Sequence, residues 1–198
     1  MDNIKVIFID LFGVLIGSDH TRILEYVISC TTNKKLDIYK ILFGEKCMEL
    51  ERGEINFSQY FQYIQSSLGD NQINFFKFSS IWNTMIAGVL PMESFIDSLK
   101  NKYRLFILTN TTQEHVRKLE KEYQFFNKMH GIITSDIAGY SKPDKQLFSF
   151  AAHYCNVKTS ECVFIDDSIN NIKAAEQQGM FVHQYQNYKQ LKVFLSSF

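Results

Sequence analysis

Four short apolar runs in this chain of 198 residues each end in polar side chains, and they constrain its fold more than any other feature. The runs are Val6–Asp10, Leu105–Asn110, Ile132–Asp136 and Val163–Asp167. Short runs rich in Val, Ile and Phe are typical of buried parallel strands. In an open parallel sheet, ligands bind just outside the carboxyl ends of the strands. We therefore expect five polar residues at these ends to meet in one crevice: Asp10, Thr109, Asn110, Asp166 and Asp167.

Helical patterns alternate with the strands in the second half of the chain. The Pro143–Asp144 pair suits the first turn of a helix, and Ser168 has the side chain of an N-cap. Thr111 and Glu114 have the spacing of a capping box, which predicts Thr111 as the N-cap of a helix that extends through Tyr123. Repeated strand–helix units predict an α/β fold with a doubly wound, Rossmann-like parallel sheet.

The pattern changes between Gly17 and about Gly88, where apolar residues recur at the spacing of amphipathic helices. This change predicts a small all-helical insertion after the first strand. The predicted domains are an α/β core of residues 1–16 and 86–198, and the insertion, residues 17–85. The insertion is rich in aromatic residues. We expect most of them to fill its own small core and one or two to face the crevice.

Composition excludes several other classes of protein. The formal net charge is zero and no basic run occurs, so a nucleic-acid-binding surface is not expected. No apolar stretch approaches the roughly 20 residues that span a bilayer, and the N-terminal residues lack the regions of a signal peptide. We therefore expect a cytoplasmic chain without membrane contacts, whose four cysteines are mostly buried thiols. No feature favours a particular oligomeric state.

Three carboxylates at the ends of two predicted strands are candidates for metal and nucleophile chemistry. Asp10 ends the first strand and precedes Gly13, which permits a tight turn. A carboxylate there can serve as a nucleophile or as a metal ligand. The adjacent Asp166 and Asp167 repel one another unless they share a cation or a hydrogen-bonded cage. Hard oxygen ligands from two strands favour Mg²⁺ as the cofactor.

Three further residues supply groups that suit an anion. Thr109 and Asn110 offer a hydroxyl, an amide and backbone N–H groups just before a predicted helix. Lys142 offers a positive charge that can offset both a phosphate and the Asp10 carboxylate. Each of these candidate residues is weak evidence by itself. Together they are strong evidence for one site, because they occur in this order and each lies at a strand end or at the start of a helix.

Four segments in this order resemble the four motifs of the haloacid dehalogenase-like (HAD) hydrolases. The segments are Asp10-Leu11-Phe12-Gly13-Val14-Leu15, Leu108-Thr109-Asn110, Ser141-Lys142-Pro143-Asp144 and Phe164-Ile165-Asp166-Asp167-Ser168. The similarity covers nearly the whole chain, and the insertion resembles the family's type 1 cap. The fourth motif is most similar to the phosphatase branch related to the N-terminal domain of epoxide hydrolases.

This resemblance implies a phosphatase that acts on a small phosphorylated metabolite. By the resemblance, Asp10 attacks phosphorus in line and forms an aspartyl-phosphate, which water then hydrolyses. Thr109 and the Asn110 backbone bind phosphate oxygens. Lys142 orients Asp10 and neutralises charge, so Asp10, Thr109 and Lys142 are the implied catalytic residues.

The resemblance also implies where the metal binds. Mg²⁺ is expected on the Asp10 carboxylate, the Phe12 backbone carbonyl and Asp167. Asp166 and Asn171 are expected to hold waters bound to the metal. A backbone carbonyl needs no particular side chain, so Phe12 does not prevent metal binding.

Position 12 nevertheless departs from the family pattern. HAD phosphatases normally carry a second aspartate there, which protonates the leaving alkoxide and later activates the hydrolytic water. Phe12 can do neither. General acid–base help is commonly worth about 10²–10⁴ in rate. We therefore expect an atypical or weak phosphatase that favours leaving groups needing no proton.

Two other functions stay open at this point. The 2-haloacid dehalogenases resemble the chain in carrying an aromatic residue at position 12, but their fourth motif lacks the paired carboxylates. A dehalogenase also needs an arginine near the substrate, whereas Arg22 and Arg52 are expected to be surface charges on the insertion. The other alternative is a non-catalytic module that binds phosphate or a partner, in which Phe12 marks lost chemistry.

Overall fold

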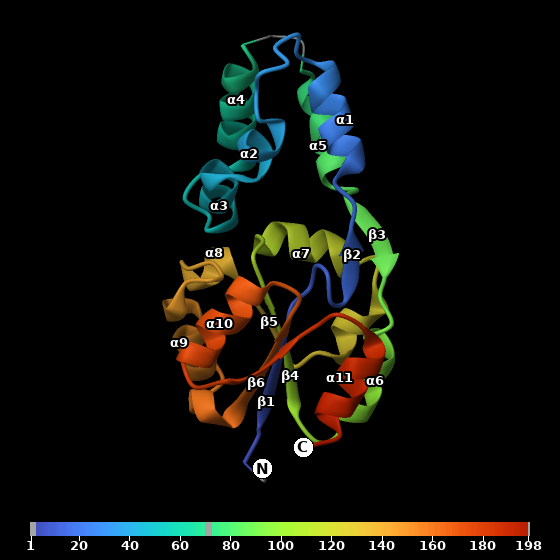
Figure 1. Ribbon diagram of the computed structural model, residues 1–198, viewed down its shortest axis with the longest axis vertical. Helices are drawn as coiled ribbons and strands as arrows, with labels where there is room; N and C mark the ends of the chain where they lie inside the picture. Colours follow the sequence, from blue (N-terminus) through green and yellow to red (C-terminus); the bar gives the residue numbers. More distant parts are fainter. Residues whose placement is uncertain (1–2, 70–72, 198) are drawn as a thin grey trace.

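The computed structural model describes residues 3–69 and 73–197, and a parallel sheet forms its centre (Figure 1). The strands of this sheet are β1 (Val6–Ile9), β4 (Arg104–Thr109), β5 (Gly131–Thr134), β6 (Cys162–Asp166) and β7 (Phe181–Gln184). They pair in parallel in the order β5-β4-β1-β6-β7, so β1 is central. The carboxyl ends of the strands therefore lie at one edge, as expected.

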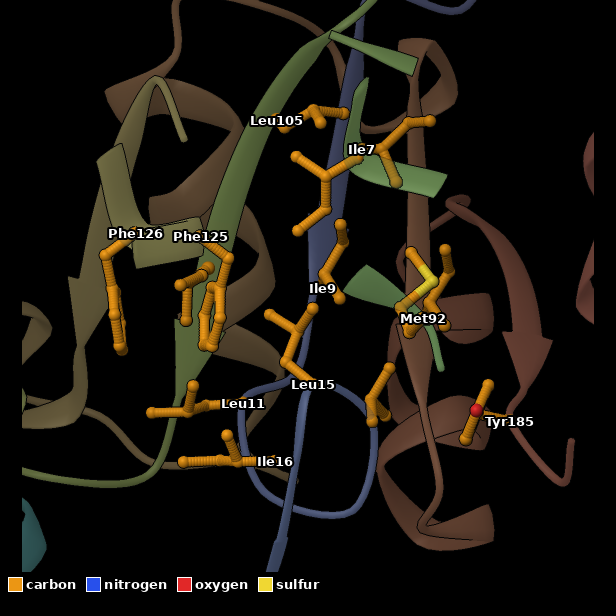
Figure 2. Close-up of a cluster of buried hydrophobic side chains, with 14 of the residues drawn as sticks. Ile7, Ile9, Leu11, Leu15, Ile16, Met92, Leu105, Phe125, Phe126 and Tyr185 are labelled. Atoms are coloured by element: carbon orange, nitrogen blue, oxygen red, sulfur yellow. The ribbon is translucent and has the colours of Figure 1, made fainter. Parts of the chain in front are cut away.

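Alternate side chains of β1 enter two separate hydrophobic clusters. Ile7 and Ile9 pack on the side covered by α6 (Glu93–Leu99), α7 (Gln113–Leu119), the 3₁₀ helix η1 (Gln124–Lys128) and α11 (Tyr188–Leu195). Figure 2 shows this cluster, with Ile7 and Ile9 near Leu105. Val6 and Phe8 pack on the opposite side, which is covered by α8 (Ser135–Ala138), α9 (Lys145–Tyr154) and α10 (Ile169–Gln177). A short 3₁₀ helix, η2 (Thr159–Glu161), precedes β6. Helices on both faces confirm the doubly wound sheet.

The insertion forms a helical layer beyond the carboxyl ends of the strands (Figure 1). Its helices are α1 (Thr21–Ser29), α2 (Ile38–Phe43), α3 (Glu45–Glu51), α4 (Phe57–Leu68) and α5 (Phe75–Trp82). Asn56 and Gln59 form a capping box at the start of α4, and Gly69, at φ +70°, ends it in the left-handed conformation. The helices share a hydrophobic cluster of their own, in which the Tyr60 hydroxyl donates to the Leu42 carbonyl at 2.5 Å.

Two short strands that the sequence pattern does not predict connect the insertion to the core. β2 (Ile16–Ser18) and β3 (Ile86–Val89) pair antiparallel, with Ile16 opposite Val89. This ribbon carries the chain out of the core and back again (Figure 1). We propose that the two domains predicted above, residues 1–16 with 86–198 and residues 17–85, meet at this ribbon.

Two local predictions are wrong by one or more residues. The run Ile132–Asp136 is a strand only as far as Thr134, because the next residues turn into α8. Thr112, not Thr111, is the N-cap of α7, since its hydroxyl accepts the His115 N–H. The Thr111 hydroxyl instead bonds the His115 ring, at 3.1 Å from Nδ1. The helix ends at Leu119, short of the predicted Tyr123.

The cysteines and the lengths of the helices bear on two expectations from composition. Cys30, Cys47, Cys155 and Cys162 are buried and form no disulfide. Among the described residues, no helix has the length and apolar character needed to cross a membrane.

Candidate active site

Asp10 and Lys142 form a buried ion pair at the carboxyl end of β1. Asp10 directly follows the strand, and its Oδ1 accepts the Leu11 backbone N–H at 2.7 Å. The Nζ of Lys142 lies 2.6 Å from the same oxygen, and both side chains are buried. Burial raises the pKa of Asp10 well above its ordinary value, while Lys142 opposes that rise. The ion pair therefore offsets part of the cost of a buried carboxylate at this strand end.

Lys142 is shared between two carboxylates and held in place by its own backbone. Its Nζ also donates to Asp166 Oδ2 at 2.8 Å. Burial alone would lower the pKa of Lys142, but Asp10 and Asp166 together raise it above its ordinary value. The Lys142 backbone N–H donates to Asn110 Oδ1 at 2.7 Å, and Asn110 Nδ2 donates to the Lys142 carbonyl at 2.9 Å. The side-chain amide of Asn110 therefore positions Lys142, and its backbone N–H is the group available to an anion.

Asp166 is completely buried and its oxygens are occupied by hydrogen bonds from the protein. Oδ1 accepts the Ser168 backbone N–H at 2.8 Å, and Asn171 Nδ2 lies 3.0 Å from Oδ1 and 3.1 Å from Oδ2. With the bond from Lys142, these contacts make Asp166 a fixed counter-ion for the lysine. The structure thus brings Asp166 and Asn171 together at the site, with Asp166 bonded to Lys142 and Asn171 bonded to Asp166.

Asp167 completes a cluster of three carboxylates. Asp10, Asp166 and Asp167 each offer an oxygen, and these oxygens lie within 4.8 Å of one another. A Cβ atom at position 13 would collide with the Asp167 carboxylate, so this approach requires Gly13. Burial, followed by the charge of Asp166, raises the pKa of Asp167. Mg²⁺ fits this set, because a cation held by hard oxygen ligands would relieve the repulsion between the carboxylates.

Thr109 provides a hydroxyl group that suits the binding of an anion. Its hydroxyl oxygen is buried at the end of β4 and has no hydrogen-bond partner among the described residues. Buried hydroxyl groups without a partner are uncommon, because each one carries an unrecovered desolvation cost. An anionic oxygen bound at this strand end would supply the missing acceptor.

A cavity of about 840 Å³ lies between these strand ends and the insertion. Asp10, Thr109 and Lys142 line it on the core side. Aromatic side chains line it on the other side: His20, Phe43, Phe57, Phe75 and Trp82. Their rings contact one another, with centroids 4.5 Å apart for His20 and Phe43 and 6.0 Å apart for Phe43 and Trp82. More aromatic residues face the crevice than the one or two expected.

Phe12, His115 and Glu51 also line the cavity. Phe12 is partly buried, and its ring centroid lies 5.9 Å from that of His115. Glu51, the last residue of α3, faces the cavity from the insertion. Neither Glu51 nor His115 belongs to a motif, and the sequence analysis missed both.

A family model described as haloacid dehalogenase-like hydrolase matches residues 4–179. The chain belongs to this family. The resemblance inferred from the four motifs is therefore confirmed, and a hydrolase is the class of enzyme that the family represents.

Two curated relatives are phosphatase-like or bifunctional hydrolases. The sesquiterpene phosphatase astK of Aspergillus oryzae is 22% identical over 148 residues, which cover 73% of this chain and 74% of that protein. The bifunctional epoxide hydrolase 2 of Mus musculus is 29% identical over 161 residues, which cover 73% of this chain. The match spans only 29% of the mouse protein, so the chain corresponds to less than a third of that enzyme.

Solved structures share the fold over nearly the whole chain. A HAD family enzyme of Bacteroides thetaiotaomicron superposes with a TM-score of 0.83 at 22% identity, covering 98% of this chain and 99% of that one. The same enzyme in complex with magnesium and inorganic phosphate superposes with a TM-score of 0.79 at 23% identity, covering 95% and 98%. At these identities the likeness establishes the fold.

Proposed function

We propose that this HAD hydrolase is a Mg²⁺-dependent phosphatase that transfers a phosphoryl group to Asp10 and then to water. The observation that carries the proposal is the buried Asp10–Lys142–Asp166 arrangement beside Asp167, at the floor of the cavity. A nucleophilic carboxylate, a fixed cation and a second carboxylate suited to a metal are the groups that phosphoryl transfer to an aspartate requires.

Magnesium would be held by Asp10, Asp167 and the backbone carbonyl of Phe12. When bound, the ion would neutralise charge on the phosphate and on the carboxylates. The raised pKa values of Asp10 and Asp167 support this assignment, because a bound cation would stabilise the charged forms that burial and the neighbouring Asp166 disfavour.

The remaining residues bind and orient the phosphate. The unpartnered Thr109 hydroxyl and the Asn110 backbone N–H are the proposed donors to its oxygens. Lys142, fixed by Asp166 and by the Asn110 side chain, neutralises negative charge and keeps Asp10 aimed at phosphorus. Asp10 then attacks in line, and the organic alcohol leaves on the side away from Asp10.

The cavity favours a phosphate ester with an apolar organic group. On the insertion side its lining includes the aromatic side chains named above together with Leu50 and Ile55, and Lys118 and Lys142 are its cationic side chains among the described lining residues. Stacked or tilted rings favour apolar and aromatic surfaces over strongly charged ones. The relative named a sesquiterpene phosphatase is consistent with this preference.

A 2-haloacid dehalogenase is the second candidate, and Phe12 is the observation that favours it. The arginines of the insertion do not support it. Arg52 is held by Glu45 and Glu54, and neither Arg22 nor Arg52 is among the described residues that line the cavity. The carboxylate pair of Asp166 and Asp167 also favours the phosphatase, because halide displacement requires no metal.

One experiment separates these functions. Phosphate release from p-nitrophenyl phosphate and halide release from 2-chloro and 2-bromo acids are measured with and without Mg²⁺. The wild type, Asp10→Asn and Asp97→Asn are compared, since Asp97 is an exposed residue of α6 paired with Lys100 and Lys128. We expect phosphate release that requires Mg²⁺ and Asp10 but not Asp97. Metal-independent turnover or halide release would contradict the proposal.

A further inference from the structure

The proposed phosphatase needs a proton donor that position 12 does not supply. Among the described residues that line the cavity, Glu51 is the one from the insertion with a carboxyl group that can take this place. Glu51 is the last residue of α3, and α3 ends directly beside α8 of the core (Figure 1). Its side chain is partly accessible, and the space it reaches is the cavity that Asp10 also lines.

A buried hydroxyl group anchors the Glu51 backbone beside the loop that follows β4. The Ser135 hydroxyl donates to the Glu51 backbone carbonyl at 2.6 Å and also lies 3.2 Å from the Thr111 carbonyl. Thr111 follows Asn110, and Ser135 is completely buried. The insertion, the loop after β4 and α8 therefore meet at one side chain, which sets the position of Glu51 relative to the proposed phosphate site.

The carboxyl group of Glu51 is available for proton transfer. None of the described residues donates a hydrogen bond to it, although its backbone is anchored. The charged and titratable groups that face it are Lys142 from the core, Arg52 and Cys47 from α3 and its end, and Tyr60 from α4. Burial raises the pKa of Glu51 to about 7, with Lys142 and Arg52 opposing the rise. A carboxyl group in this range can both donate and accept a proton near neutral pH.

The other titratable groups around the cavity are less suited to this role. Burial lowers the pKa of His115 to about 4, so near neutral pH its imidazole lacks the second proton that makes an imidazolium an effective acid. Asp136 already accepts the Thr134 hydroxyl and two backbone N–H groups. Glu114 is exposed and pairs with Lys118.

We propose that Glu51 of the insertion replaces the aspartate missing at position 12 as the general acid and base of the reaction. This inference rests on the proposed phosphatase function. An Asp10 oxygen bonds to phosphorus as the bond from phosphorus to the ester oxygen breaks, and the Glu51 proton passes to that oxygen to give the alcohol. The Glu51 carboxylate then takes a proton from the attacking water. The bond from phosphorus to Asp10 breaks, which gives inorganic phosphate and restores both carboxyl groups.

The test compares leaving groups of similar size in Glu51→Gln and in the wild type. Benzyl phosphate releases an alkoxide that needs a proton, whereas p-nitrophenyl phosphate releases a stable phenolate. We expect kcat/KM for benzyl phosphate to fall by about 10²-fold or more in Glu51→Gln and kcat/KM for p-nitrophenyl phosphate to change only a few-fold. Glu49→Gln is the matched control, because Glu49 lies on the same helix, pairs with Lys46 and does not line the cavity.

A second variant excludes a simple folding defect. Adding Phe12→Asp to Glu51→Gln returns a carboxyl group to position 12, and we expect it to restore benzyl phosphate hydrolysis. An equal fall in kcat/KM for both esters would mean that Glu51 only binds the substrate, and this result would overturn the inference. Unchanged kcat/KM for both esters would also overturn it. In both cases, turnover that requires Asp10 would still support the proposed function. If neither ester is hydrolysed in a reaction that requires Asp10, both proposals are overturned.

Discussion

Thr109 and Thr134 lie opposite each other in the register of β4 and β5, yet only one of their hydroxyl groups has a partner. Both residues are buried. The Thr134 hydroxyl donates to the Asp136 carboxylate, whereas the Thr109 hydroxyl has no partner among the described residues. The threonine hydroxyl of β5 thus makes a hydrogen bond within the protein, whereas we expect that of β4 to bind a ligand.

Thr109→Val should therefore separate binding from stability. Valine has nearly the same shape, and the lost hydroxyl makes no bond to the described part of the protein. We expect the free energy of unfolding to stay within about 1 kcal/mol of the wild type, while KM for phosphate esters rises about tenfold from one lost charge-assisted hydrogen bond. Thr134→Val is the control, with a stability loss of about 1–3 kcal/mol and no specific change in KM. A loss of stability without a change in KM in Thr109→Val, and a raised KM in Thr134→Val, would contradict the assignment of Thr109 to the phosphate site.

Lys142→Met should destabilise the protein and abolish turnover. It leaves Asp10 and Asp166 buried without their shared cation, a loss commonly worth about 3–5 kcal/mol. Lys100→Met removes an exposed pair with Asp97 and should cost at most about 1 kcal/mol. Urea unfolding measures both. The loss in free energy of unfolding caused by Lys142→Met should become smaller as pH falls, because Asp10 becomes protonated and no longer requires the cation. A stability loss that does not vary with pH would contradict the explanation that the loss arises from the buried carboxylates.

Glu51 should make the folded state less stable as pH rises. Its pKa is about 7 when folded against an ordinary value of 4.5, so the folded state binds its proton more tightly than the unfolded state. Stability therefore falls as pH rises from about 4.5 through about 7. Glu51→Gln lacks this titration and should be up to about 3 kcal/mol more stable than the wild type above that range. Urea unfolding across this range tests the prediction, with Glu49→Gln as the control. Parallel curves of the free energy of unfolding against pH for Glu51→Gln and the wild type would contradict the prediction.

In the Glu51→Gln background, where Glu51 no longer supplies an acid, Phe12→Asp should widen the range of esters that the protein hydrolyses. The added carboxyl group lies next to the cavity and can protonate an alkoxide leaving group. We expect a larger gain for alkyl phosphates than for p-nitrophenyl phosphate. Phe12→Asn has nearly the same shape as the aspartate variant but no acid, so it should lack the gain. An equal change in the two variants would show that loss of the Phe12 ring, and not the new acid, is responsible.

The residues at the strand ends were predictable because parallel strands bring their carboxyl ends to one edge. Asp10, Thr109 and Asp166 follow from this rule alone, and their placement needs no knowledge of packing. Lys142 precedes a helix and depends on motif order, but its ion pairs with Asp10 and Asp166 could only be seen in three dimensions.

Glu51 could not be recognised in the same way. It is one acidic residue among many in a helical insertion, and its role depends on a hydrogen bond across the fold from Ser135, 84 positions later in the chain. The β2–β3 ribbon was missed for a similar reason, since two short segments far apart in the chain are strands only because they pair. Thr112 rather than Thr111 caps α7 because the Thr111 hydroxyl bonds the His115 ring instead.

Trapping the phosphorylated enzyme tests the central claim most directly. Glu51→Gln is mixed with p-nitrophenyl phosphate and Mg²⁺, quenched in acid within one turnover, digested and examined by mass spectrometry. The first step should proceed while hydrolysis lacks its base, so we expect a phosphoryl group on the peptide containing Asp10, absent without Mg²⁺ and absent in Asp10→Asn. Turnover without any modification of Asp10, or a phosphoryl group on another residue, would contradict the account.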